Sequence, residues 1–132
     1  MQITRQAEYS IRAIRYISRQ GQDQRVATSI VARETQIPLA FLAKIVGQLS
    51  IAGLLRTSRG SRGGVTLGRD PKDISMLDVV EAIDGPIKLN ECVGKINTCD
   101  VKNDCTLYPV WQSMQDNLVA RLGATRFDVS LN

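Results

Sequence analysis

The chain has 132 residues, 43% of them hydrophobic, and a formal net charge of +4 with no histidine. This length predicts one domain with an appended element, and the lack of histidine excludes Ser-His and Cys-His catalytic pairs and imidazole metal ligands. No apolar run approaches the length of a membrane span and no signal-peptide pattern is present, so we expect a cytoplasmic protein without a membrane partner.

Positive charge is concentrated in the first half of the chain. Residues 1–70 contain eleven Lys or Arg and four Asp or Glu, whereas residues 71–132 contain six and nine. A basic half of this kind fits a polyanionic partner, so residues 1–70 are the candidate nucleic-acid-binding part.

A first helix is predicted to begin after Thr4, which can cap it, and to stop at Gly21. Its apolar residues follow helical spacing and form the expected buried stripe: Ala7, Ile11, Ile14 and Ile17 or Ser18. Its arginines lie mostly on other faces, where they either reach phosphates or form a solvated basic surface: Arg5, Arg12, Arg15 and Arg19.

Residues 28–52 predict a helix-turn-helix pair. A short helix starts at Thr28 or Ser29 and ends near Thr35, and Ile37-Pro38 breaks the chain because the residue before proline disfavours helical geometry. The second helix, over about 39–52, buries one face: Leu42, Ile45, Val46 and Leu49. Such a helix enters the major groove of DNA. Five candidate DNA-contacting residues lie on this helix outside its buried face: Leu39, Ala40, Ala43, Lys44 and Gln48. A sixth candidate, Thr28, begins the preceding helix.

Residues 54–58 and 65–67 read as two strands joined by the basic, glycine-rich tip RGSRGG. Glycines allow left-handed backbone and close approach to a surface. A β-wing of this kind places its tip in a minor groove or on phosphates, and the candidate contacts are Arg59, Ser61 and Arg62. The alternative is an ordinary basic hairpin tip. Ser75 and Asp78 then resemble a capping box that opens a helix ending at Gly85-Pro86, which we expect to pack on the first helix.

Three cysteines follow within fourteen residues: Cys92, Cys99 and Cys105. Turn-forming residues separate them, so the segment can wrap several thiolates around one centre. Their spacing differs from the close pairs of zinc sites, and their odd number argues against a closed disulfide framework. Soft thiolates suit an iron–sulfur cluster, and the alternative is three ordinary cysteines in a loop.

A last helix is predicted over about residues 108–122, with Pro109 in its first turn. Its apolar positions follow the 4-3-4 spacing of a coiled-coil seam: Leu107, Trp111, Met114 and Leu118. This stripe either forms a dimer interface or packs on its own domain. A dimer is the expectation, because helix-turn-helix proteins usually read palindromes as dimers.

The sequence resembles the IscR/NsrR-type (Rrf family) regulators over nearly its whole length. The segments that carry the resemblance are Glu8-Tyr9-Ser10, Ile37-Pro38, residues 42–54, the wing motif at 58–65 with Leu67-Gly68-Arg69, residues 74–75 with 81–85, and the three cysteines. The resemblance implies a mainly α fold, with a winged helix-turn-helix domain, a small two-stranded β-wing and a long C-terminal dimerisation helix.

The resemblance also implies a homodimer whose long helices cross, with an iron–sulfur cluster between the cysteine loop and the partner's first helix. Glu8 matches a position at which some relatives supply a carboxylate ligand from the opposite subunit. Its alternative role is to interact with the dipole of its helix. Two positions depart from relatives: Tyr108 stands where some have a ligating histidine, and Ala43 where some have an acidic residue that affects operator choice.

We therefore expect a DNA-binding domain at residues 1–85, a cluster-binding loop at 86–106 and a dimerisation helix with its tail at 107–132. The predicted protein is a transcriptional regulator of a palindromic double-stranded operator and not an enzyme. The expected ligands of its cluster, 2Fe–2S in preference to 4Fe–4S, are Cys92, Cys99, Cys105 and Glu8. The alternative is the same scaffold without a cluster, sensing through its thiols or a partner protein.

Overall fold

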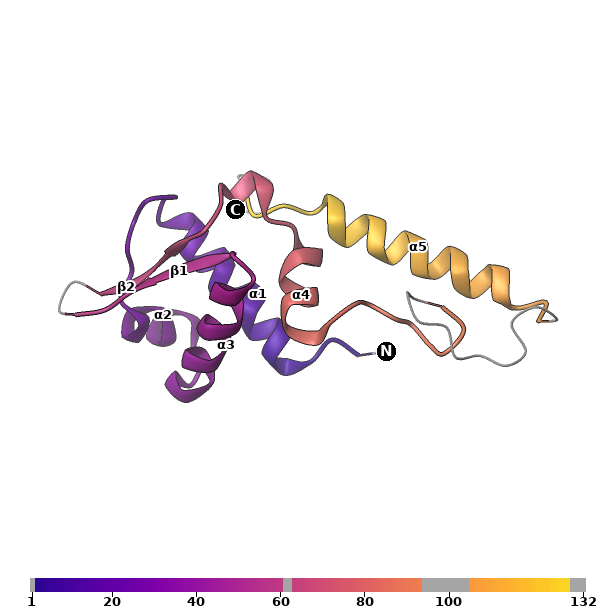
Figure 1. Cartoon of the computed structure of the whole chain (residues 1–132), viewed down its shortest axis with the longest axis horizontal. Coiled ribbons are helices and arrows are strands. Elements are labelled where there is room, and N and C mark those ends of the chain that lie inside the picture. The colour runs from indigo at the N-terminus through magenta and orange to yellow at the C-terminus, as the bar shows by residue number, and fades with distance from the viewer. Residues whose placement is uncertain (1, 61–62, 94–104, 129–132) are drawn as a thin grey trace.

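The computed structural model describes residues 2–60, 63–93 and 105–128. Within these residues the chain is mainly helical with one two-stranded antiparallel sheet, as predicted (Figure 1). In chain order the elements are α1 (Arg5–Arg19), α2 (Thr28–Thr35), α3 (Leu39–Ile51), β1 (Leu55–Ser58), β2 (Gly64–Leu67), the 3-10 helix η1 (Pro71–Asp73), α4 (Met76–Asp84) and α5 (Tyr108–Ala124).

Helix α1 lies at the centre of the domain and contacts α2, α3, α4 and β2. It begins where predicted, because the Thr4 hydroxyl caps it by accepting a hydrogen bond from the Ala7 amide at 3.1 Å. Asp84, at the end of α4, in turn accepts a hydrogen bond from the Thr4 amide at 3.2 Å. The start of α1 is therefore fixed to the end of α4.

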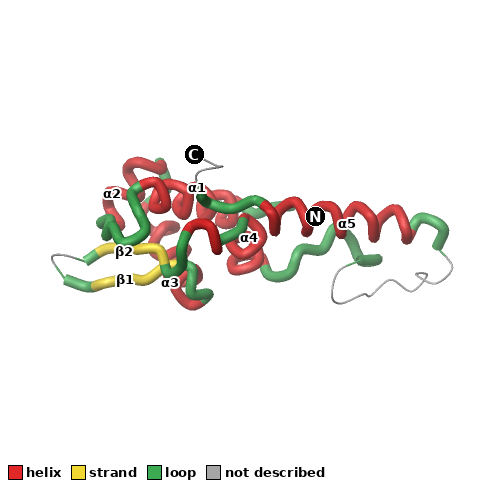
Figure 2. Tube along the Cα trace, turned by 90° about the horizontal axis from the view of Figure 1, so that it is seen from above, coloured by secondary structure: helices red, strands yellow, loops and turns green. Residues whose placement is uncertain are grey.

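The hydrophobic core lies between α1, α3, α4 and the sheet. Helix α3 contributes the four positions that its spacing predicts, Leu42, Ile45, Val46 and Leu49. In the sheet, Leu55 pairs with Leu67 and Ser58 with Gly64, and both leucines are buried. Burying one face of α3 in this way leaves its opposite face in solvent. In the view of Figure 2, α3 lies at the lower edge of the molecule beside β1.

Helix α4 has the predicted capping box. The Ser75 hydroxyl accepts from the Asp78 amide at 3.0 Å, and the Asp78 carboxylate accepts from the Ser75 amide at 3.0 Å. Gly85, at φ 79°, ends the helix. As predicted, α4 packs on α1.

Helix α5 extends away from the domain that holds the sheet and contacts it through α4 (Figure 1). After α5 the chain turns back to the domain. The Met76 amide donates to the Thr125 carbonyl at 2.8 Å, and the Phe127 amide donates to the Ile74 carbonyl at 3.1 Å. The Phe127 side chain is 1% exposed and belongs to the core of the domain. This return was not anticipated from the sequence.

In the described parts of the chain, no helix combines the length and apolar character that crossing a membrane requires.

Candidate nucleic-acid interface and cysteine loop

The turn between α2 and α3 is tight and sets the direction of α3. Gln36 adopts the left-handed conformation at φ 58°, and the Ile37 amide donates to the Ala32 carbonyl at 3.1 Å. Pro38 precedes α3, and its carbonyl accepts from the Leu42 amide at 3.0 Å. Ile37 is buried, so the turn is anchored in the core. This is the helix-turn-helix arrangement that presents the second helix to a groove.

The exposed face of α3 carries most of the residues predicted to contact DNA: Leu39, Ala40, Ala43 and Lys44. Gln48 is half-buried, and its Oε1 has no hydrogen-bond partner among the described residues. Thr28, the first residue of α2, is also half-buried.

Phe41 was not among the residues predicted to contact DNA, although it is 49% exposed beside this face. Its ring lies against Tyr9 of α1, with the centroids 6.3 Å apart and the planes tilted by 58°. The available signal was an aromatic side chain at a position of α3 outside the predicted buried face.

The wing is the hairpin formed by β1 and β2. Val26 fixes it to the segment before α2, because Val26 and Val65 exchange two backbone hydrogen bonds of 2.9 and 2.8 Å. A Cβ atom at Gly64 would collide with the Val26 carbonyl, so this close approach requires glycine. Arg59 is exposed at the end of β1, whereas Ser61 and Arg62 lie outside the described residues.

Arginines of α1 line a groove of about 340 Å³ against the end of α2. The Arg12 guanidinium donates from Nη1 to the Thr35 carbonyl at 3.1 Å and lies 5.4 Å from the centre of the Tyr9 ring. Arg15 and Arg19 line the same groove. Arg12 of α1 is thus connected, through the rings of Tyr9 and Phe41, to the start of α3.

The cysteine loop leaves α4 and enters α5. Cys92 and Cys105 are half-buried, and Cys99 lies in 94–104, outside the described residues. Glu8 is exposed in the first turn of α1. Within residues 2–60, 63–93 and 105–128 of one protomer, no three cysteine or carboxylate side chains come together as a metal site.

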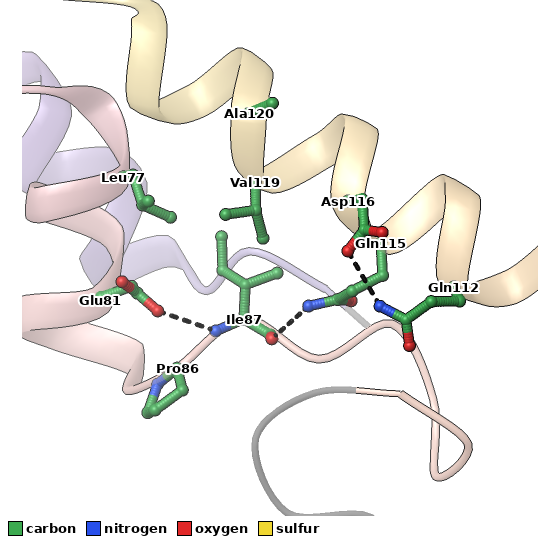
Figure 3. A pocket seen from close by; sticks show the side chains of 9 residues that line it. All are labelled: Leu77, Glu81, Pro86, Ile87, Gln112, Gln115, Asp116, Val119 and Ala120. Carbon is green, nitrogen blue, oxygen red and sulfur yellow. Dashed lines mark hydrogen bonds between the residues drawn. The ribbon is translucent and has the colours of Figure 1, made fainter.

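The first part of the loop is bound to both α4 and α5, as Figure 3 shows. The Ile87 amide donates to the Glu81 carboxylate at 3.3 Å, and the Ile87 carbonyl accepts from Gln115 Nε2 at 2.7 Å. Gln115 Oε1 also accepts from the Leu89 amide at 3.0 Å. These contacts border a groove of about 530 Å³ between α4 and α5, with Leu77 and Val119 on its walls.

Helix α5 leaves its apolar side chains largely in solvent. Leu107, Val110 and Met114 are 59%, 55% and 48% exposed, and Trp111 and Leu118 are half-buried. Gln115 is the one buried residue of this helix. Of the predicted stripe, Leu107 and Met114 are therefore exposed, and Trp111 and Leu118 are partly covered.

The family described as "Rrf2: Iron-dependent Transcriptional regulator" matches residues 3–129. The chain belongs to the Rrf2 family. The resemblance seen in the sequence is thereby confirmed, and the protein is a DNA-binding transcriptional regulator rather than an enzyme.

Relatives of this Rrf2 regulator include proteins described as HTH-type transcriptional regulators. It is 31% identical over 108 residues to the HTH-type transcriptional regulator NsrR of Shouchella clausii, covering 81% of this chain and 72% of that protein. It is 26% identical to the HTH-type transcriptional regulator IscR of Xenorhabdus nematophila, covering 94% of this chain and 75% of that protein.

Solved structures share the fold of this Rrf2 regulator. The B. subtilis protein CymR, titled a global cysteine regulator, superposes with a TM-score of 0.81 at 20% identity, covering 100% of this chain and 98% of that chain. The T. potens IscR structure superposes with a TM-score of 0.75 at 20% identity, covering 99% of this chain and 86% of that chain. The predicted fold class, a winged helix-turn-helix domain with a small wing and a long last helix, is confirmed.

Proposed function

We propose that this Rrf2 regulator is a cytoplasmic homodimer whose binding to a palindromic operator is controlled by an iron–sulfur cluster. The observation that carries the proposal is the donor set of the loop: Cys92, Cys99 and Cys105, in a chain without histidine. Cys92 and Cys105 are half-buried, and cysteine sulfur is the soft ligand that suits such a cluster. A 2Fe–2S cluster is favoured over 4Fe–4S.

Glu8 is the proposed fourth ligand, supplied from the partner's first helix. Its carboxylate is exposed at the start of α1, whose position is fixed by the bond from Thr4 to Asp84. The competing role of Glu8, interaction with the helix dipole, predicts no effect on iron.

A bound cluster would supply sensitivity to redox state, nitric oxide or iron–sulfur supply. The residues of the chain provide the route from the loop to DNA. Cys92 follows a segment that Glu81 and Gln115 hold against α4 and α5. Helix α4 contacts both α1 and α3, so a shift of the loop reaches the DNA-reading helix through direct packing.

The proposed dimer interface is the exposed apolar side of α5, formed by Leu107, Val110, Trp111, Met114 and Leu118. Large apolar side chains that remain in solvent along one helix fit the core of a subunit interface. A two-fold dimer would present two α3 helices and two wings to the halves of a palindrome. The proposed contacts are the α3 and wing residues named above, with Thr28.

The second candidate function is the same regulator sensing through its thiols or through a partner protein, without a cluster. The observation that favours it is that Cys92 and Cys105 are half-buried rather than fully buried, so solvent reaches part of both side chains. Such thiols are open to reversible oxidation if they are accessible as thiolates.

Anaerobic purification followed by visible spectroscopy and iron analysis separates the two candidates. The cluster proposal predicts a coloured protein with charge-transfer bands, and loss of iron when Cys92, Cys99 or Cys105 is changed singly to Ala. Each variant should keep the helical circular dichroism of the parent, because Cys92 and Cys105 lie outside the core cluster of the described residues and Cys99 lies outside the predicted helices. A protein that stays colourless after anaerobic reconstitution with iron and sulfide supports thiol sensing instead.

A further inference from the structure

The solvent-facing side of α3 is unusually poor in hydrogen-bonding groups for a helix that reads DNA. Opposite the buried Leu42 and Leu49 lie Ala40, Ala43 and Gly47. Lys44 is the only charged residue of the helix, and the half-buried Gln48 is the other candidate hydrogen-bonding contact of this helix. Base edges are usually read by hydrogen bonds from Arg, Asn, Gln or Glu, whereas Ala and Phe contact the methyl group of thymine. The surface of α3 therefore favours apolar readout.

Gly47 is not explained by packing within the protomer. It is exposed, and a methyl group added to it would meet no atom within 4 Å beyond the backbone of its own helix and its chain neighbours. Glycine inside a helix costs roughly 0.5–1 kcal/mol relative to alanine. It lies on the same face as Ala40 and Ala43, so the backbone of α3 is uncovered by side chains at this point of the face.

Larger apolar side chains border this small-residue face. Leu39 is 55% exposed on one side, and Phe41 is 49% exposed on the other. The contact of Phe41 with Tyr9 limits the movement of its ring. This face thus carries small side chains along its centre and larger apolar side chains at its edges. Such a face suits the floor of a DNA groove that presents methyl groups.

We propose that α3 reads thymine methyl groups in the major groove, with Ala40 and Ala43 in contact with them and Gly47 admitting the DNA close to the helix backbone. The proposal rests on operator binding through α3. It defines the class of operator: half-sites in which thymines, rather than guanines, carry the sequence information opposite these residues.

The first test begins with selection of a binding site from a randomised duplex. Each thymine of the selected half-site is then replaced by deoxyuridine, which removes only the methyl group. We expect about fourfold weaker binding for each methyl in contact, the factor equivalent to about 0.8 kcal/mol for one buried carbon unit. Replacing a thymine outside the half-sites is the control. In Ala43→Ser, discrimination between thymine and uracil should disappear at one base pair.

The second test adds a methyl group at Gly47. Gly47→Ala should unfold at a higher temperature than the parent, yet bind the selected duplex roughly tenfold more weakly, because the added group would intrude on a packed interface. The matched control is Gly123→Ala in α5, where an added Cβ would make an ordinary contact with Leu77 at 3.6 Å and binding should not change.

Full affinity for every deoxyuridine duplex overturns methyl readout, and full affinity of Gly47→Ala overturns the close approach. A pool that stays random after selection overturns the proposal together with the sequence-specific binding on which it rests. A defined selected site that tolerates uracil at all positions overturns this proposal alone.

Discussion

Gln115 donates from Nε2 to the carbonyl oxygen of Ile87 at 2.7 Å, across 28 positions of the sequence. Gln115 is 5% exposed and Ile87 is 6% exposed, so this hydrogen bond is shielded from water. It joins the segment leading to Cys92 to the middle of α5. A polar residue is thus buried on a helix whose apolar residues remain largely exposed, which indicates that the bond positions the loop.

Replacing Gln115 with leucine removes this bond and leaves the buried Ile87 carbonyl without its partner. We expect the free energy of unfolding to fall by about 1–3 kcal/mol, the usual cost of an unsatisfied buried polar group. Urea denaturation measures it. The control is Gln112→Leu on the same helix, where the amide bonds the Asp116 carboxylate near the surface at 2.9 Å. Equal stability of the two variants would show that the Gln115 bond is not structural.

Replacing Arg59 with alanine should weaken operator binding by about 1–3 kcal/mol, the scale of one good arginine contact with DNA. The fold should not change, since this side chain is exposed at the end of β1. Fluorescence anisotropy at matched salt measures the affinity. The control is Arg121→Ala, which removes one positive charge from α5, far from the wing in the sequence. If this variant weakens binding as much as Arg59→Ala, the effect of Arg59 is only one of net charge.

Changing Met114 to glutamate should convert the proposed dimer into monomers, because a charge would be placed at the centre of the apolar side of α5. Sedimentation equilibrium measures the change. Ser113→Glu, at the preceding and likewise exposed position, adds the same charge outside the stripe and should leave the dimer intact. A Met114→Glu dimer as tight as the parent's would place the interface elsewhere.

Glu8→Ala and Glu8→Cys test the proposed fourth ligand. Alanine should make the cluster more labile, whereas cysteine should shift its absorption bands, because a thiolate would replace a carboxylate. Spectra recorded anaerobically report the absorption bands, and spectra followed over time after exposure to air report the lability of the cluster. Glu34→Ala removes an exposed carboxylate of α2 as the control. Unchanged bands and unchanged lability in both Glu8 variants would exclude it as a ligand.

The sequence predicted those parts of the fold that local signals determine. Thr4, the Ser75 and Asp78 pair and Gly85 mark helix ends through bonds spanning only a few residues. The buried face of α3 followed from the spacing of its apolar residues. The left-handed conformation of Gln36 was not predicted. It belongs to the turn in which the Ile37 amide bonds the Ala32 carbonyl, and the glutamine side chain gives no sign of it.

For the candidate site, the types of residue were predictable but their connections were not. The cysteines and the wing arginines stand out by composition and spacing. Nothing local marks Gln115, since a buried glutamine on a surface helix looks like any exposed one until its partner at Ile87 is known. Phe41 was missed because its contact with Tyr9 joins two helices.

The placement of Phe127 means that the DNA-binding half is not a separable piece of chain. Its ring fills part of the core beneath Ile74, although it follows α5 in the sequence. A fragment that stops at Asp84 would lack a fully buried aromatic side chain, a loss of the size that typically costs 3–5 kcal/mol. The chain thus leaves the domain through the cysteine loop and α5, and it returns at Phe127 before the core of the domain is complete. A nascent chain therefore completes the DNA-binding domain only after the cysteine loop and α5 have been synthesised.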